Sequence, residues 1–209
     1  VYSLTKQFDE LATKAGLSYW ATAGTLLGQK RHKGMIPWDD DGDYVIRLAD
    51  LPKLHSLKDE LEAQGIMLYE GPLGLWKLAY TDEKRIELFG TNESAALDIL
   101  TNEQNKDGVW VPTNGLYRDL YPNEVFLDEE INNLERAPFG PNGLTVPVPK
   151  HSERFLQSVY GDDCLEYGVR THSHKGFFGI KLGNFEFNPV LTKQRVKIIG
   201  NYATGNVWK

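Results

Sequence analysis

Four aspartates lie within a run of five residues, Asp39-Asp40-Asp41-Gly42-Asp43, which follows a short apolar stretch. In an extended segment alternate side chains face the same side, so Asp39, Asp41 and Asp43 would share one face. Three carboxylates placed there repel one another, and the apolar flanks make their desolvation costly. A divalent cation would reverse that balance, because Mg²⁺ prefers carboxylate oxygens together with the phosphate oxygens of a substrate. We therefore predict a site for Mg²⁺, with Mn²⁺ as a possible substitute, and treat a solvated acidic loop as the alternative.

A Gly-Thr pair precedes the acidic run. Gly24-Thr25 stands where a strand expected over residues 18–23 passes into a helix expected from about residue 26 to residue 32. Glycine lets a phosphate approach the backbone closely, and the free amides of a first helical turn capped by Thr25 can hold an anion. Four cations are candidates for further phosphate contacts, and a surface position is the alternative for each: Lys30, Arg31, Lys33 and Lys77.

A third acid is expected on a neighbouring strand. Asp98 is the candidate, because it lies alone in the apolar segment Ala96–Leu100, where an unpaired charge would be costly. The alternative for Asp98 is a structural acid paired with an arginine or a backbone amide. Glu87, in a strand expected over residues 86–89, is a rival of the same kind. Catalysis and metal binding are thus predicted for Asp41, Asp43 and Asp98, with Asp39 as the substitute ligand.

Helical and strand patterns alternate along the chain. Helices are expected over residues 3–16, over 51–63 with Asp50 as the cap, and over 153–160 with Ser152 as the cap. Strands are expected over 44–48, 67–70, 75–80, 95–100, 109–111 and 144–148. Residues 112–143 are rich in Pro, Asn and Gly and predict a loop-rich lobe with a short strand over 124–127. This interleaving predicts an α/β or α+β class.

Composition limits the other possibilities. The chain has 209 residues, 41% of them hydrophobic, which is enough for a core without disulfides or a structural metal. We predict one domain over residues 1–163, with residues 164–209 as an extension packed on it. No apolar stretch approaches the ~18 residues of a membrane span. The net charge of −6 gives no overall attraction to nucleic acid. Because the chain starts at Val1, we expect a fragment that an anchor or signal could precede.

Two further features have no assigned role. Cys164 is a single cysteine, so a disulfide framework and a multi-cysteine zinc site are excluded. His172 and His174 form a His-x-His pair, which on a strand could bind a metal. With no third ligand evident, we expect the two histidines to lie near an acceptor or on a loop.

Three blocks of this sequence resemble the LicD family, which contains bacterial phosphocholine transferases and, as animal relatives, fukutin and fukutin-related protein. The first block is Ala23-Gly24-Thr25-Leu26-Leu27-Gly28 with Arg31-His32-Lys33-Gly34, and the second is Ile36-Pro37-Trp38-Asp39-Asp40-Asp41 with Asp43. The third is Gly143–Pro149 with Phe155-Leu156 and Tyr160-Gly161-Asp162. The resemblance covers roughly residues 5–163, and its first part is the most specific.

The resemblance implies a nucleotidyltransferase-like mixed sheet flanked by helices. In that superfamily a Gly-Ser or Gly-Thr turn precedes an Asp-x-Asp pair, and a third acid lies on a later strand. Carried over, Gly24 and Thr25 are the turn, Asp41 and Asp43 the metal pair, and Asp98 the third acid. The residue between the pair is usually apolar and is glycine here, which leaves Asp39 with Asp41 open as the alternative pair.

The resemblance also implies an activity. It is the Mg²⁺-dependent transfer of a phospho-alcohol, such as phosphocholine or phosphoribitol, from a CDP-linked donor to a hydroxyl of a glycan or lipid-linked saccharide, with release of CMP. One alternative is a true nucleotidyltransferase that moves a nucleoside monophosphate. Another is an inactive domain that binds a glycan or phosphate. Bacterial members act in the cytoplasm and animal members in the secretory pathway, so the compartment stays open.

Overall fold

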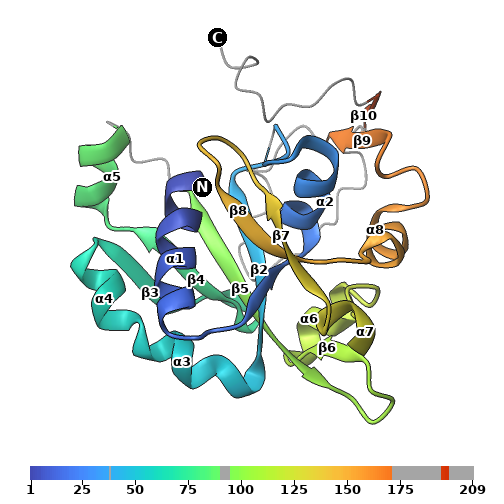
Figure 1. Cartoon of the computed structure of the whole chain (residues 1–209), viewed down its shortest axis with the longest axis horizontal. Coiled ribbons are helices and arrows are strands. Elements are labelled where there is room, and N and C mark those ends of the chain that lie inside the picture. Colours follow the sequence, from blue (N-terminus) through green and yellow to red (C-terminus); the bar gives the residue numbers. More distant parts are fainter. Residues whose placement is uncertain (38, 90–94, 171–193, 198–209) are drawn as a thin grey trace, which may run out of the picture.

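The computed structural model describes residues 1–37, 39–89, 95–170 and 194–197, and it is organised around one mixed sheet (Figure 1). The strands lie in the order β1 (Tyr19–Ala21), β2 (Asp41–Arg47), β5 (Ala96–Gln104), β4 (Trp76–Tyr80) and β3 (Ile66–Glu70), with β6 (Trp110–Pro112) also paired to β5. Only β2 and β5 run parallel among these pairs. The expected mixed α/β class, with helices flanking the sheet, is confirmed.

Three helices cover one face of the sheet: α1 (Tyr2–Lys14), α3 (Leu51–Ser56) and α4 (Lys58–Ala63). Leu4, Phe8 and Leu11 recur at helical spacing on α1 and are buried. The Thr5 hydroxyl contacts Tyr44 of β2 at 3.3 Å, so Tyr44 marks the face that α1 covers. Since neighbouring residues of a strand point to opposite faces, Asp41 and Asp43 lie on the other face.

The second face carries α2 (Ala23–His32), α8 (Glu153–Tyr160) and a lobe formed by α6 (Gly115–Leu120) and α7 (Asp128–Ile131). Trp20 of β1 lies opposite Val45 in the register and contacts the ring of Phe126 edge-on. Phe126 stacks on Phe155 of α8 with ring centroids 4.1 Å apart. This aromatic column holds the lobe and α8 against the sheet on the side of the aspartates.

The remaining elements are short. A hairpin of β7 (Leu134–Pro138) and β8 (Thr145–Pro149) forms a second small sheet, and β9 (Tyr167–Arg170) pairs with β10 (Gln194–Lys197) in a third. Two single 3₁₀ turns, η1 (Leu48–Asp50) and η2 (Pro72–Gly74), follow β2 and β3. The predicted division between residues 1–163 and 164–209 stays a prediction.

The strand predicted over residues 86–89 is wrong, because these residues belong to α5 (Asp82–Phe89). The apolar alternation of Ile86 and Leu88 suggested a strand, yet both side chains are exposed. The Thr81 hydroxyl accepts a hydrogen bond from the backbone N–H of Lys84 at 3.3 Å. Such a side-chain contact with the first turn is a helix-start signal, and here it outweighs the alternation.

Other predicted boundaries also need correction. The single helix over residues 51–63 is two helices, because the N–H of Leu57 bonds tightly back to the carbonyl of Leu54 and ends α3. The lobe is rich in loops, as predicted, and it also contains the short elements α6, α7 and β7. Its expected strand over 124–127 is one isolated bridge between Trp110 and Phe126. The bounds of α8 are as predicted, but the Ser152 hydroxyl makes no capping bond.

Candidate active site

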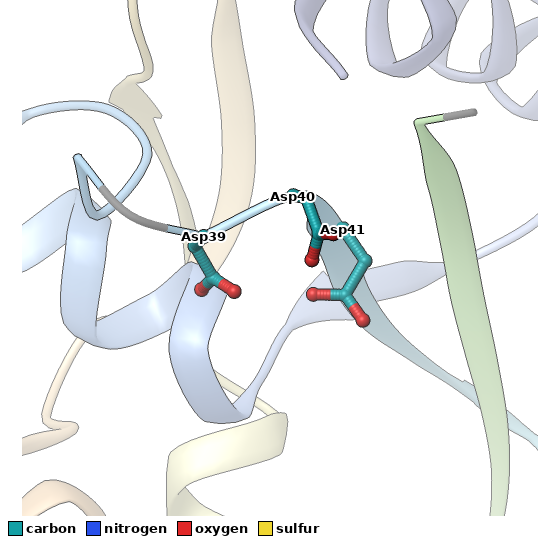
Figure 2. A group of neighbouring side chains, drawn as sticks. All are labelled: Asp39, Asp40 and Asp41. Carbon is teal, nitrogen blue, oxygen red and sulfur yellow. The ribbon is translucent and has the colours of Figure 1, made fainter. Parts of the chain in front are cut away.

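The predicted acids converge where β2 and β5 lie side by side. Asp41 and Asp43 stand on β2, and Asp43 is directly opposite Asp98 of β5 in the parallel register. Asp39 lies just before β2, on the segment that leads into it. Figure 2 shows the side chains of Asp39, Asp40 and Asp41 projecting to the same side of this segment. The structure therefore places Asp39, Asp41, Asp43 and Asp98 at the junction of β2 and β5.

Ligand atoms of three carboxylates come within 4.8 Å of one another among the described residues, and they belong to Asp39, Asp40 and Asp41. Asp43 and Asp98 are not in this group. The geometry thus places Asp39 beside Asp41, the alternative pair, while Asp43 lies deeper in the strand. The choice of ligand pair stays a prediction.

These carboxylates disfavour one another's charge. Burial, followed by the charge of Asp41, raises the pKa of Asp39 to about 7. Burial and then Asp98 raise the pKa of Asp41. For Asp43, burial and the charges of Asp41 and Asp39 hold the pKa well above its usual range. Several acids are therefore kept in an arrangement that costs free energy until a positive charge arrives.

Gly24 lets two of these acids lie against the first turn of α2. A Cβ atom at Gly24 would stand 2.7 Å from Asp39 Oδ2 and 3.3 Å from Asp43 Oδ2, so any side chain there would displace a carboxylate. Ala23, at the start of the helix, has a φ of 42°. This left-handed backbone is uncommon outside glycine and makes the strand-to-helix turn sharp. The role of Gly24 in binding phosphate stays a prediction.

The predicted capping of α2 by Thr25 is wrong, because Thr22 is the N-cap residue. Thr25 is fully buried, and its hydroxyl accepts a hydrogen bond from the backbone N–H of Asp43 at 2.7 Å. The carbonyl of Asp43 in turn accepts from the N–H of Thr22 at 3.0 Å. The structure thus shows Thr25 holding β2 in place at Asp43.

Asp98 is ion-paired. Lys77 Nζ lies 2.5 Å from Asp98 Oδ1, and the two side chains are 11% and 8% exposed. The structural alternative named an arginine or a backbone amide as the partner, and the partner is a lysine from β4. Glu87, the rival acid, lies on α5, where it pairs with Lys84, so it does not share a strand with Asp98.

The three basic residues predicted to contact phosphate near α2 lie at the C-terminal end of that helix. Lys30 Nζ lies 4.0 Å from Glu153 of α8. Arg31 Nη1 donates to the carbonyl of Tyr167 at 3.2 Å, and burial lowers the Arg31 pKa. Lys33 ends α2 in a left-handed conformation. These contacts place two of the three against the C-terminal part of the chain, and their predicted phosphate contacts stay predictions.

Three residues of the lobe and α8 that the sequence did not single out as site residues interact electrostatically with Asp43: Tyr117, Glu124 and Tyr160. Glu124 is buried and accepts a hydrogen bond from the Tyr117 hydroxyl at 2.7 Å. Burial raises the pKa of Glu124, and the charge of Glu124 in turn raises that of Asp43. Burial and then Asp43 hold the pKa of Tyr160 well above its usual range. A lone Glu before the apolar Val125-Phe126 was the available signal.

The donor set fits a hard divalent cation. It consists of carboxylate oxygens only, several of them on one face, and Gly24 leaves room for two of them beside a helix start. His172 and His174 lie outside the described residues, so their predicted position stays a prediction. In the part of the chain that the structure describes, no helix is long and apolar enough to cross a membrane.

Comparison with known proteins gives one family match. Residues 16–151 match the family model described as the LicD/FKTN/FKRP nucleotidyltransferase domain. An uncharacterized protein of Rickettsia prowazekii, RP689, is 34% identical over 141 residues, covering 67% of this chain and 47% of that protein. Human ribitol 5-phosphate transferase FKRP is 30% identical over 154 residues, covering 73% and 29%. The Haemophilus influenzae lipopolysaccharide cholinephosphotransferase LicD is 53% identical over 36 residues, covering 17% and 14%. The chain thus spans less than half the length of each of these relatives.

Proposed function

Because this chain belongs to the LicD/FKTN/FKRP nucleotidyltransferase-domain family, we propose that it transfers a phospho-alcohol from a CDP-linked donor to a glycan hydroxyl. Two named relatives support the class of reaction, since one is a ribitol 5-phosphate transferase and the other a cholinephosphotransferase. The observation that carries the proposal is the cluster of carboxylates on β2 and β5, held against the start of α2.

The proposed reaction is a displacement at the β-phosphorus of the donor. The acceptor oxygen forms a bond to that phosphorus, and the bond from the phosphorus to the oxygen bridging the two phosphates breaks, so CMP leaves. Mg²⁺ or Mn²⁺, when bound, would neutralise the charge that develops on the diphosphate. Asp41 and Asp43, with Asp39 as the substitute, are the residues proposed to hold it.

The remaining residues would accept the proton of the acceptor hydroxyl and orient the site and the donor. Asp98 is proposed as the third acid of the cation site, beside Asp41 and Asp43, and one of these three carboxylates as the group that takes the proton from the acceptor hydroxyl. Thr25 keeps Asp43 in register through its hydrogen bond to the backbone N–H. The first turn of α2, at Gly24 and Thr25, is proposed to approach the donor phosphates.

The test is a panel of CDP-alcohols. The protein would be incubated with Mg²⁺, a glycan acceptor mixture and CDP-choline, CDP-ribitol, CDP-glycerol or CDP-ethanolamine, and nucleotide products followed by mass. We expect CMP from one donor, and loss of CMP release in Asp41→Asn. Asp59→Asn is the matched control, because Asp59 is exposed on α4, across the sheet from the cluster.

Two other results would redirect the assignment. Release of diphosphate from a nucleoside triphosphate would favour the true nucleotidyltransferase. If no nucleotide were consumed, binding of CDP would be titrated with and without Mg²⁺. Absence of Mg²⁺-dependent CDP binding would then contradict the proposed enzyme and favour a binding domain.

A further inference from the structure

We infer that Lys77 is a positioning residue for Asp98: it holds Oδ1 of that carboxylate and leaves Oδ2 for the cation, instead of contacting donor phosphate. This inference rests on the cation site of the proposed function. It replaces the role that the sequence suggested for Lys77, and it gives the β3–β4 hairpin a part in assembling the site.

The sheet register places the three charges in one row. Asp43 on β2 lies opposite Asp98 on β5, and Asp98 lies opposite Lys77 on β4. Residues directly opposite one another on neighbouring strands point to the same face. The order across the sheet is therefore acid, acid, base, with Asp98 between Asp43 and Lys77.

Burial and distance show what the ammonium is already bound to. Lys77 Nζ lies 2.5 Å from Asp98 Oδ1, and the side chain of Lys77 is only 11% exposed. A buried ammonium and a buried carboxylate each become costly when the other is removed. An ammonium has three N–H donors, and Asp98 accepts from one of them. Because only 11% of the Lys77 side chain is exposed, the structure favours the orienting role over contact with a donor phosphate.

Gly71 makes the position of Lys77 depend on the hairpin turn. The N–H of Gly71 donates to the carbonyl of Leu75 at 2.7 Å, which closes the turn between β3 and β4. A Cβ at Gly71 would lie 3.0 Å from both Cδ and Cε of Lys77. The φ of Gly71 is −100°, which alanine adopts without strain. Gly71→Ala therefore presses on the lysine stem and leaves the charges in place.

The experiment measures Mn²⁺ binding by electron paramagnetic resonance, without nucleotide, so the result does not depend on the reaction. Partners that orient a metal ligand typically contribute about 10–100-fold to metal affinity. We expect Lys77→Met to weaken Mn²⁺ binding by about that factor and Lys77→Arg to weaken it less. Gly71→Ala should weaken binding when Lys77 is present and have no further effect in the Lys77→Met variant. Asp98→Asn should weaken it at least as much.

A double-mutant cycle tests the mechanism. If Lys77 acts through Asp98, the double variant Lys77→Met with Asp98→Asn should bind Mn²⁺ within about twofold of Asp98→Asn alone. Lys84→Met is the matched control, because Lys84 is also ion-paired with an acid, Glu87, but on α5. Should Lys77→Met fail to fold, Lys77→Arg and Gly71→Ala carry the test, since both keep the positive charge.

Four results would overturn the inference. Unchanged Mn²⁺ binding by Lys77→Met would mean that the lysine has no part in the cation site. Tighter binding would mean that the lysine merely opposes the cation. Independent, multiplying effects of Lys77→Met and Asp98→Asn would mean separate roles. Weaker binding of CDP without metal, at unchanged Mn²⁺ affinity, would return Lys77 to the phosphates. Failure of the CDP-alcohol panel together with absence of Mg²⁺-dependent CDP binding, in contrast, would contradict the proposed function and leave the Mn²⁺ result standing.

Discussion

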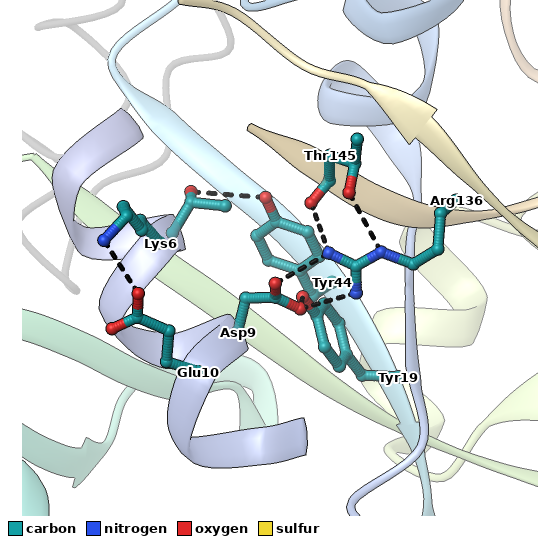
Figure 3. Close-up of polar contacts among 8 residues, drawn as sticks. Lys6, Asp9, Glu10, Tyr19, Tyr44, Arg136 and Thr145 are labelled. Atoms are coloured by element: carbon teal, nitrogen blue, oxygen red, sulfur yellow. Dashed lines mark hydrogen bonds and ion pairs between the residues drawn. The ribbon is translucent and has the colours of Figure 1, made fainter. Parts of the chain in front are cut away.

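Two groups of aspartates in this protein have opposite surroundings. Asp9 on α1 receives both arms of Arg136 from the β7–β8 hairpin, at 2.7 and 2.6 Å, and the hydroxyl of Tyr19 at 2.5 Å (Figure 3). The acids at Asp39, Asp41 and Asp43 face mainly one another, and burial and mutual charge raise their pKa values. Asp9 accepts three hydrogen bonds from side chains, whereas no comparable set of donors contacts the other three aspartates among the described residues.

The difference separates what stabilises the fold from what serves the proposed reaction. A carboxylate with a bidentate arginine and a hydroxyl donor gains charge-assisted hydrogen bonds and ties distant segments together. Clustered carboxylates cost free energy, and such arrangements are found where a site is prepared for a ligand. The two groups should therefore respond in opposite ways to the same Asp→Asn substitution.

Asp43→Asn should have the largest effect on activity and little on stability. Removing a ligand of the proposed cation loses several kcal/mol of transition-state stabilisation, so CMP release should fall roughly 1,000-fold. Without a divalent cation, the midpoint of thermal unfolding should stay the same or rise, because one repelling charge is gone. Steady-state kinetics and a thermal melt in EDTA check both parts. A melt far below that of the wild type would mean that Asp43 is structural.

Arg136→Ala should show the reverse pattern. It leaves Asp9, whose side chain is 15% exposed, without its main partner. Losing a partner of a buried charged group costs about 1–3 kcal/mol, which for a chain of this size lowers the unfolding midpoint by roughly 2–4 °C per kcal/mol. Catalytic turnover at 25 °C should stay within about threefold, since the pair lies on the α1 side of the sheet. Arg136→Lys is the control that keeps the charge but not the bidentate contact.

The contribution of Asp39 to the stability of the cation-free protein should fall as pH rises from 5 to about 8. The pKa of Asp39 is about 7 in the folded chain and about 4 when unfolded, so the folded state binds more protons in this window. The stabilisation is complete below the unfolded pKa and is lost as pH rises through the folded one. Thermal melts in EDTA check this, and Asp39→Asn should flatten the profile. Saturating Mg²⁺ should flatten or invert it, because the cation binds the ionised form.

The smallest effect is expected at Lys6. Its ammonium lies 2.7 Å from Glu10 one turn along α1, and both side chains are more than half exposed. Exposed pairs of this kind contribute about 0.3–0.5 kcal/mol. Lys6→Ala should therefore shift a urea midpoint barely beyond error, although the contact is drawn in the same close-up as the contacts of Arg136 (Figure 3). A loss above about 1 kcal/mol would mean that burial is a poor guide to the value of ion pairs here.

Much of the candidate site could be predicted because its signals are local. The order of Gly24-Thr25 and the aspartate run, and the lone acid in an apolar strand, are visible without a fold. The bounds of α8 followed from helical spacing and its closing glycine. In α5 the same local reasoning failed, because the alternation of Ile86 and Leu88 carried no information about which side would be buried.

What the sequence determined by itself is therefore the chemistry available: carboxylates at strand spacing, a flexible glycine before them, and the alternation of helices and strands. Only the tertiary structure decided the partners. The parallel pairing of β2 with β5 placed Asp98 beside Asp43, although 54 residues separate them along the chain. The antiparallel pairing of β4 with β5 placed Lys77 beside Asp98, and the packing of the lobe brought Glu124 towards Asp43. Propensity and periodicity act over a few residues, whereas pairing between strands depends on how the whole chain buries its apolar surface.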